Sequence, residues 1–193
     1  MKKLLIILFL GPFVSFSQVR VPHFPVDSAT NRIQYQVTMA FPGVKKEKVF
    51  DLMNKWFTDY VQPTKQPFKD VQSDHITLFT GIVTSNNYSK RVGANGGEFN
   101  ASYATFFDME IVATDEKAVL TLKNFRANLF GYSINLEDFR DRNFPRIPPV
   151  YAEYTTYIYD MYSYFLNDVN QRADGETSNA EKYVAKAKKK GQI

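Results

Sequence analysis

Asp108 and Glu110 are the two residues whose types and spacing come nearest to acid–base chemistry. They occupy alternate positions in the segment 103–113 (YATFFDMEIVA), so a strand places both carboxylates on one face. Paired carboxylates can act as general acid and base, as they do in glycosidases. The same spacing is typical of the solvated face of a half-buried strand, with Lys123 and Arg126 as cross-strand charge partners. The second interpretation is the one we favour.

Other catalytic and cofactor chemistries find little support. The two histidines, His23 and His75, lack convincing metal ligands at neighbouring positions, and the chain has no cysteine. Thiol nucleophiles, thiolate metal sites and disulfides are therefore excluded. There is no G-x-S-x-G sequence, and the glycine-rich segment 93–97 (GANGG) lacks the ending of a phosphate-binding loop. We expect no catalytic residue, no metal and no cofactor.

Aromatic residues, which make up 16% of the chain, are its most suggestive compositional feature. Tyr157, Tyr159 and Tyr164 flank the apolar stripe of an expected helix. A tyrosine in that position can stack on a sugar or a peptide and offer a hydroxyl at its tip. These three residues are the candidate ligand-binding rim, although tyrosines also commonly border an ordinary helix–sheet core.

Charge is unevenly distributed along the chain. The formal net charge is +4, and the last thirteen residues, with five lysines and one glutamate, carry all of it. Without Lys2 and Lys3, which belong to the N-terminal segment discussed below, residues 18–180 carry a net charge of −2. A near-neutral body argues against a nucleic-acid partner. The lysine-rich end could bind an anionic membrane surface or an acidic polymer, but a solvated terminus is the interpretation we favour.

The first half of the chain predicts a strand, a helix and a second strand. Residues 32–40 alternate between apolar and polar types, as a half-buried strand does. Residues 45–61 have one apolar face at helical spacing. Residues 75–84 form a strand pattern in which Gly81 indicates a bulge or a close approach of another backbone segment. Residues 85–102 are rich in asparagine and glycine, and we expect a long mobile loop there.

The second half predicts a hairpin and a helix. The alternating runs 103–113 and 118–128 are joined by a four-residue turn, 114–117. A turn-rich link, 129–149, leads to an amphipathic helix at 150–171. A polar linker at 173–178 and a weak helix at 179–190 complete the chain. This order predicts an α+β fold, with an antiparallel sheet and both helices packed on one of its faces.

The pattern resembles an exported bacterial family, domain-of-unknown-function family 4468, found mainly in Bacteroidetes-type bacteria. The resemblance rests on Phe41-Pro42-Gly43, Trp56 in the following helix, Gly81 in the next strand and Asn124-Phe125 near the end of the hairpin, and it covers roughly residues 32–171. It implies a TATA-box-binding-protein-like fold and no established reaction or catalytic residue. The fold name implies no DNA binding, because one fold hosts many functions.

The first seventeen residues have the pattern of a secretory signal peptide. Lys2 and Lys3 precede an apolar run, and Ser15 and Ser17 are the small residues expected before a cut between Ser17 and Gln18. The apolar run is too short for a membrane span, which needs about 20 residues. We therefore expect a periplasmic or secreted protein whose mature chain has no stable membrane insertion.

These patterns divide the chain into a signal peptide (1–17), an extended lead-in (18–31), a single α+β domain (32–171), and a polar linker with a lysine-rich tail (172–193). We expect a non-enzymatic binding or accessory module whose partner is an unidentified ligand or envelope protein. Two alternatives remain open. One is a carrier that holds an apolar molecule in a helix-grip cavity, and the other is an envelope hydrolase that uses Asp108 or Glu110.

Overall fold

The computed structural model describes residues 19–61, 68–73, 75–92, 97–141, 144, 147 and 154–191. The predicted signal peptide and its cut site lie outside these residues. The elements, in chain order, are β1 (Tyr35–Ala40), α1 (Lys46–Trp56), the π-helical turn η1 (Phe57–Val61), β2 (Phe68–Ser73), β3 (Ile76–Val92), β4 (Gly97–Thr114), β5 (Lys117–Leu129), β6 (Tyr132–Asn135), α2 (Leu136–Arg140) and α3 (Thr155–Lys189).

The strands form one antiparallel sheet in the order β1-β5-β4-β3-β2, and β6 extends it by pairing with β5. β1 pairs with residues 117–122 of β5, whereas β6 pairs with residues 126–129 of the same strand. The two strands therefore follow one another along one edge of β5. Within the described residues, no helix has the length and apolar character that a membrane span requires.

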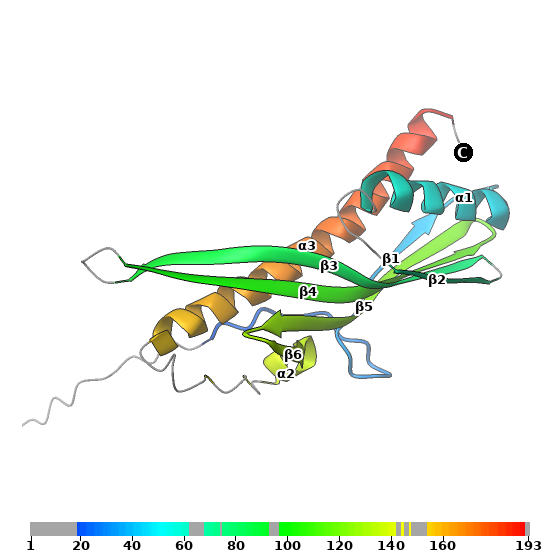
Figure 1. Ribbon diagram of the computed structural model, residues 1–193. Helices are drawn as coiled ribbons and strands as arrows, with labels where there is room; N and C mark the ends of the chain where they lie inside the picture. Colours follow the sequence, from blue (N-terminus) through cyan, green and yellow to red (C-terminus); the bar gives the residue numbers. More distant parts are fainter. Residues whose placement is uncertain are drawn as a thin grey trace, which may run out of the picture.

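Both long helices cover the same face of the sheet. α1 packs on β4 and β5, and α3 contacts β1, β3 and β4 (Figure 1). Side chains alternate along a strand, so Tyr103, Met109 and Ile111 of β4 are buried against the helices while their neighbours point away. The predicted fold class, an α+β sheet with one helix after the first strand and a long C-terminal helix on the same face, is confirmed.

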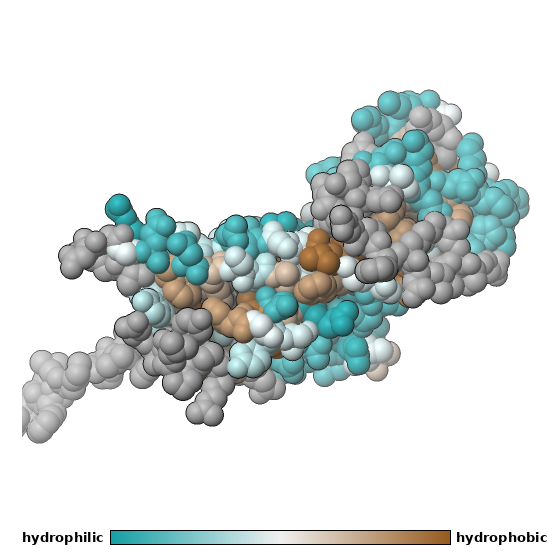
Figure 2. Space-filling model, viewed as in Figure 1, coloured by the Kyte–Doolittle hydropathy of each residue, from teal (hydrophilic) through white to brown (hydrophobic). Residues whose placement is uncertain are grey.

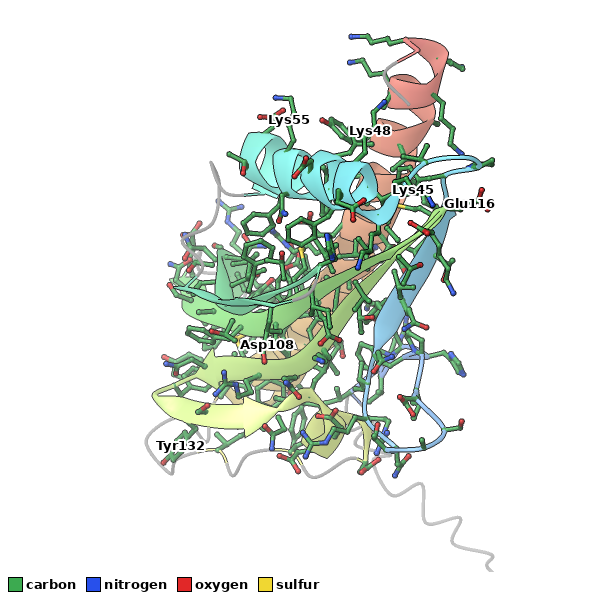
Figure 3. The ribbon with its side chains drawn as sticks, turned by 90° about the vertical axis from the view of Figure 1, so that its right-hand side faces the viewer. Lys45, Lys48, Lys55, Asp108, Glu116 and Tyr132 are labelled. Atoms are coloured by element: carbon green, nitrogen blue, oxygen red, sulfur yellow. The ribbon has the colours of Figure 1, made fainter. Side chains whose placement is uncertain are left out.

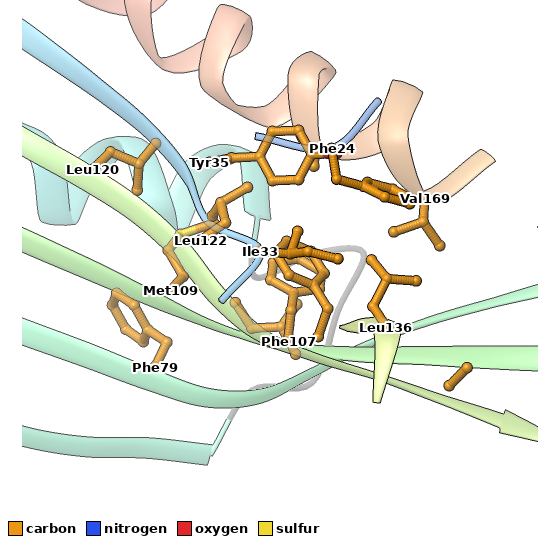
Figure 4. Packing of buried hydrophobic residues seen from close by; sticks show 14 of the residues in the cluster. Phe24, Ile33, Tyr35, Phe79, Phe107, Met109, Leu120, Leu122, Leu136 and Val169 are labelled. Atoms are coloured by element: carbon orange, nitrogen blue, oxygen red, sulfur yellow. The ribbon is translucent and has the colours of Figure 1, made fainter. Parts of the chain in front are cut away.

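The core lies between this face and α3. Figure 4 shows Leu122 and Tyr35 of the sheet pointing toward α3, and Phe24 of the N-terminal segment beside the helix. Val19 is buried as well, and the Arg20 N–H donates to Ser163 Oγ of α3 at 2.9 Å. The segment predicted as a lead-in thus contributes to the core, and the packed domain begins before residue 32.

The C-terminal helix is continuous from Thr155 to Lys189, which corrects the prediction of a polar linker and a separate tail. Ala173, Ala180 and Ala187 are buried seven residues apart, so a narrow stripe of small side chains packs on the domain. Trp56 Nε1 also donates to Asn179 Oδ1 at 3.1 Å. These tertiary contacts explain why the helix continues through Gly175, which disfavours a helix by roughly 1 kcal/mol relative to alanine.

The segment 85–102 is the second correction, because most of it is strand rather than loop. β3 and β4 pair continuously from Ile82↔Phe107 to Val92↔Gly97, and residues 93–96 lie outside the described residues. α3 anchors this long hairpin: Tyr88 contacts Tyr164, the Lys90 ammonium pairs with Asp160, and Asn86 Nδ2 donates to Asp168 Oδ2 at 3.3 Å.

The predicted hairpin 103–113/118–128 is confirmed, with a shorter turn than expected. Thr114 pairs with Lys117, so only Asp115 and Glu116 form the turn. Three short elements were not predicted: β2, and the strand and helix β6 and α2 inside the segment expected to be a link. Their short lengths leave little room for a periodic pattern.

Candidate functional site

The face of the sheet opposite the helices, which we call the open face, carries a polar groove. Figure 2 views this face and shows hydrophilic side chains around an apolar centre. The groove encloses about 630 Å³ between β3, β4 and the end of β5. Its lining residues are Ser85, Asn86, Asn87, Phe99, Asn100, Ala101, Ser102, Tyr103, Ala104, Asn128, Phe130 and Gly131, and we call it the amide groove.

The amide groove is uncharged and rich in hydrogen-bonding groups. None of its described lining residues is Asp, Glu, Lys or Arg. Ser102 Oγ donates to Asn87 Oδ1 at 2.8 Å, which orients the Asn87 amide. Asn100 and Asn128 are exposed, and their side chains form no hydrogen bond with the described residues. Each can offer one acceptor and two donor hydrogens to a ligand.

The neighbouring α3 contacts hold the sheet beneath the groove. Tyr103 OH donates to Asp168 Oδ2 at 3.1 Å, and Arg172 Nε donates to the same carboxylate at 2.9 Å. Burial raises the pKa of the Tyr103 phenol, and the nearby Asp168 carboxylate raises it further. Tyr103 therefore stays neutral and remains a donor at physiological pH. Its hydrogen bond to Asp168 attaches this end of the groove to α3 on the other side of the sheet.

Asp108 is a structural carboxylate at a double bulge. The Gly81 N–H donates to its Oδ1 at 3.1 Å, and Asn124 Nδ2 donates to its Oδ2 at 2.8 Å. The register shifts beside it in both strand pairs, β3–β4 and β4–β5. Gly81 and Asn124 have φ values of +64° and +56°, a conformation that glycine and asparagine tolerate best. The bulge predicted at Gly81 is confirmed.

Glu110 lies next to this bulge, in an ion pair with Lys123 at 2.9 Å. The predicted cross-strand partnership is therefore confirmed for Lys123, whereas Arg126 forms no ion pair with the described residues. Figure 3 shows Asp108 within the sheet, well away from the labelled Tyr132 beyond the groove end of β5. Neither Asp108 nor Glu110 lines the amide groove, so this groove does not support the hydrolase hypothesis.

The three tyrosines of the predicted rim lie on α3 and do not share one surface. Tyr157 stacks near Phe99 with 6.2 Å between ring centroids, and Tyr164 contacts Tyr88 at 5.6 Å. Both face the β3–β4 hairpin. Tyr159 instead contacts Phe144 and Tyr162 on another side of the helix. None of the three lines the amide groove, and their role in binding stays a prediction.

One small pocket lies between α3 and the sheet, beside Phe107, Phe125 and Val169. It measures about 10 Å³, close to the smallest volume that can hold one water molecule. A carrier of an apolar molecule requires a far larger enclosed cavity, of roughly 300 Å³ or more. This packing counts against the helix-grip carrier.

The histidines lie apart from these features. His23 is exposed, and the His75 ring packs on Phe50 with its Nε2 3.9 Å from a Glu47 oxygen. In the part of the chain that the structure describes, no three His, Asp or Glu side chains converge as metal ligands.

The residues of the amide groove were missed by sequence analysis because Asn87, Asn100 and Ser102 fall in the segment interpreted as a loop. A weak alternation was present: Phe99, Ala101 and Tyr103 occupy every second position, as strand residues facing a core do. Their polar neighbours Asn100 and Ser102 line the groove together with them.

Comparisons with known proteins agree with the fold and name no activity. The family model described as "Domain of unknown function (DUF4468) with TBP-like fold" matches residues 35–128, and no curated protein matches the chain. A DUF4468 family protein from Bacteroides ovatus is 11% identical, with a TM-score of 0.46, covering 76% of this chain and 87% of its own. A TBP-like protein from Parabacteroides distasonis is also 11% identical, with a TM-score of 0.41, covering 81% of this chain and 98% of its own. Residues 35–128 of this chain are therefore similar to the family of unknown function DUF4468, which is described as having a TBP-like fold.

Proposed function

We propose that this protein is an exported, non-enzymatic binding module that holds a neutral, hydroxyl-rich ligand, such as a segment of an oligosaccharide, in the amide groove. The N-terminal pattern of Lys2, Lys3, an apolar run and small residues before Gln18 supports export. The observation that carries the binding proposal is the uncharged groove of asparagine and serine side chains on the open face.

The chemistry of the groove favours a neutral ligand over an ionic one. Lining side chains such as Asn100, Asn128 and Ser85 both donate and accept hydrogen bonds, and sugar hydroxyls do the same. A nucleic acid would need cationic side chains along its phosphates, and the described lining supplies none. Phe130 adds an apolar wall on which the C–H face of a sugar ring can lie.

The size of the groove agrees with such a ligand. A volume of about 630 Å³ falls within the range of small-molecule sites, roughly 300–1,000 Å³. Asn128 comes from β5, whereas Asn100 and Asn87 come from β4 and β3, so a ligand that reaches all three spans three adjacent strands. A short oligosaccharide is long enough to do so, because neighbouring strands lie about 4.8 Å apart.

The test is an NMR titration of the mature protein with a panel of neutral oligosaccharides, following the side-chain amide resonances of asparagine. A binding sugar should shift the resonances of Asn87, Asn100 and Asn128. Asn100→Ala and Asn128→Ala should each weaken binding by a few-fold to about tenfold, the usual effect of one lost hydrogen bond. Asn167→Ala, an exposed asparagine on α3, is the matched control and should bind like the wild type.

Two results would contradict the proposal. The first is a panel in which no sugar shifts the groove amides, or in which Asn167→Ala weakens binding as much as the groove variants do. The second concerns catalysis: cleavage of a bound sugar that disappears in Glu110→Gln would show that the module is an enzyme.

A further inference from the structure

A second groove lies between the two long helices, at the C-terminal end of α3. It measures about 400 Å³ and is lined by Leu52, Lys55, Asp59, Tyr183, Lys186, Ala187 and Lys190. We call it the lysine groove. It is on the helix side of the sheet and shares no lining residue with the amide groove, so the inference below does not depend on the proposed function.

Helical spacing explains how these residues meet. Leu52, Lys55 and Asp59 follow one another at intervals of three and four along α1 and η1. At the end of α3, Lys186 and Ala187 lie three and four residues after Tyr183, and the C-cap residue Lys190 lies four and three residues after them. Val184 and Ala187 are buried, which holds the end of α3 against the domain. The lysines predicted to form a solvated tail are therefore displayed from an ordered helix.

The lysine groove has an excess of positive charge. Three lysines and one aspartate line it, a net charge of +2. Lys55 Nζ lies 3.0 Å from an Asp59 oxygen, so this pair is internally neutralised. Lys186, in the last turn of α3, and Lys190, the C-cap residue one turn later, form no ion pair with the described residues. Figure 3 shows Lys55 on the outer side of α1, away from the sheet.

Cations interact favourably with the C-terminal end of a helix, which explains why lysines occur in the last turn of α3. It does not explain why particular lysine side chains point into the groove. Lys188, in the same turn, lies over the Phe41 ring at 5.9 Å and does not line the groove. Lys186 and Lys190 do line it, beside the apolar surfaces of Leu52 and Ala187. The groove thus combines two uncompensated ammonium groups with an apolar floor.

We propose that the lysine groove binds the phosphate group of a phosphate monoester, with the organic part of the ester against Leu52, Ala187 and the Tyr183 ring. A phosphate monoester carries a charge of about −1.5 to −2 near pH 7, which matches the excess charge of the groove. The ammonium group of lysine is a compact point charge that suits phosphate. The groove volume of about 400 Å³ is large enough for one such group.

The experiment is an NMR titration at low salt with glycerol phosphate and, in parallel, inorganic phosphate, observing the backbone amides around Tyr183 and Lys186. The wild type should bind glycerol phosphate saturably and more tightly than inorganic phosphate. The double variant Lys186→Gln/Lys190→Gln should lose about tenfold or more for each lysine removed, as expected for hydrogen bonds to a charged group.

The matched control is Lys182→Gln/Lys189→Gln. It removes the same charge from the same helix at two exposed positions outside the groove, and it should retain most of the affinity. Circular dichroism of both variants checks that α3 is still formed.

The alternative source of phosphate is a lipid headgroup, which co-sedimentation with phosphatidylglycerol vesicles tests. Vesicle binding that both double variants lose equally, without saturable binding of glycerol phosphate, would overturn the proposal in favour of diffuse attraction to a charged surface. Equal loss of glycerol phosphate binding in both double variants would overturn it as well.

Discussion

The two faces of the sheet are built from the same strands, and they differ in what their side chains do. On β4, Phe107, Met109 and Ile111 are buried under the helices, whereas Phe106 and Glu110 belong to the open face. The covered face buries its side chains against the helices, and the pocket described there beside α3 measures only about 10 Å³. The open face holds a groove of about 630 Å³.

This difference indicates which face of the sheet can determine ligand specificity in such a fold. Residues of the covered face must fit one another, since a change of even one methylene group is felt in a close-packed core. Residues of the open face have no such constraint, so asparagines and serines can be placed there without loss of stability. We therefore expect covered-face substitutions to change folding and open-face substitutions to change binding.

The largest expected effect comes from two adjacent phenylalanines that point to opposite faces. Phe107→Ala should lower the free energy of unfolding by about 3–5 kcal/mol, because it empties a buried site where the Phe107 ring stacks on Phe125. Phe106→Ala, the matched control on the half-buried open side, should cost about 1 kcal/mol. Denaturant unfolding of both variants measures the difference, and equal losses would refute the two-face description.

A smaller loss of stability is expected from substitution of Asp108, which lies at the double bulge in strands β3, β4 and β5. Asp108→Ala should cost about 1–3 kcal/mol in unfolding free energy, because it leaves the half-buried Gly81 N–H without its acceptor. Asp108→Asn keeps one acceptor oxygen and should lose less. The measurement is again denaturant unfolding.

A stability unchanged by Asp108→Ala would mean that the bulge is maintained by the backbone alone. In that case Gly81→Ala, which places a side chain at a φ of +64°, should be the more costly substitution.

The same contrast explains which parts of the fold could be predicted from sequence. β1, α1 and the β4–β5 hairpin each bury one side against the core, and their apolar residues recur with the period of the element. The bulge at Gly81 was predictable from a glycine within a strand. The other bulge, at Asn124, depends on the hydrogen bond to Asp108, and no local pattern indicates it.

The long β3–β4 hairpin could not be predicted because its stability comes from distant residues. Asn86, Tyr88 and Lys90 contact α3 residues 70 or more positions later in the chain. In isolation the segment is polar and glycine-rich, as loops are. The amide groove was missed for the same reason, since its asparagines become neighbours only when the strands pair.

The second half of α3 could not be predicted for the same reason, because distant residues stabilise this helix as well. Its buried residues are mostly alanines, whose weak hydropathic contrast with lysine and glutamate gives little periodicity. The helix is stabilised by contacts such as Trp56 with Asn179, 123 residues apart. The lysine groove therefore follows from an interaction that no local pattern reveals.

The smallest expected effect concerns the Glu110–Lys123 pair of the open face. Its side chains are 29% and 30% exposed, so water screens the interaction and its contribution to stability should be small. A double-mutant cycle with Glu110→Ala and Lys123→Ala should give a coupling energy of about 0.2–1 kcal/mol, and 1 M salt should reduce it. A coupling above about 2 kcal/mol would be typical of a desolvated pair, and would mean that this part of the open face is covered in solution. The measured value therefore decides whether the open face is exposed to water around Glu110 and Lys123.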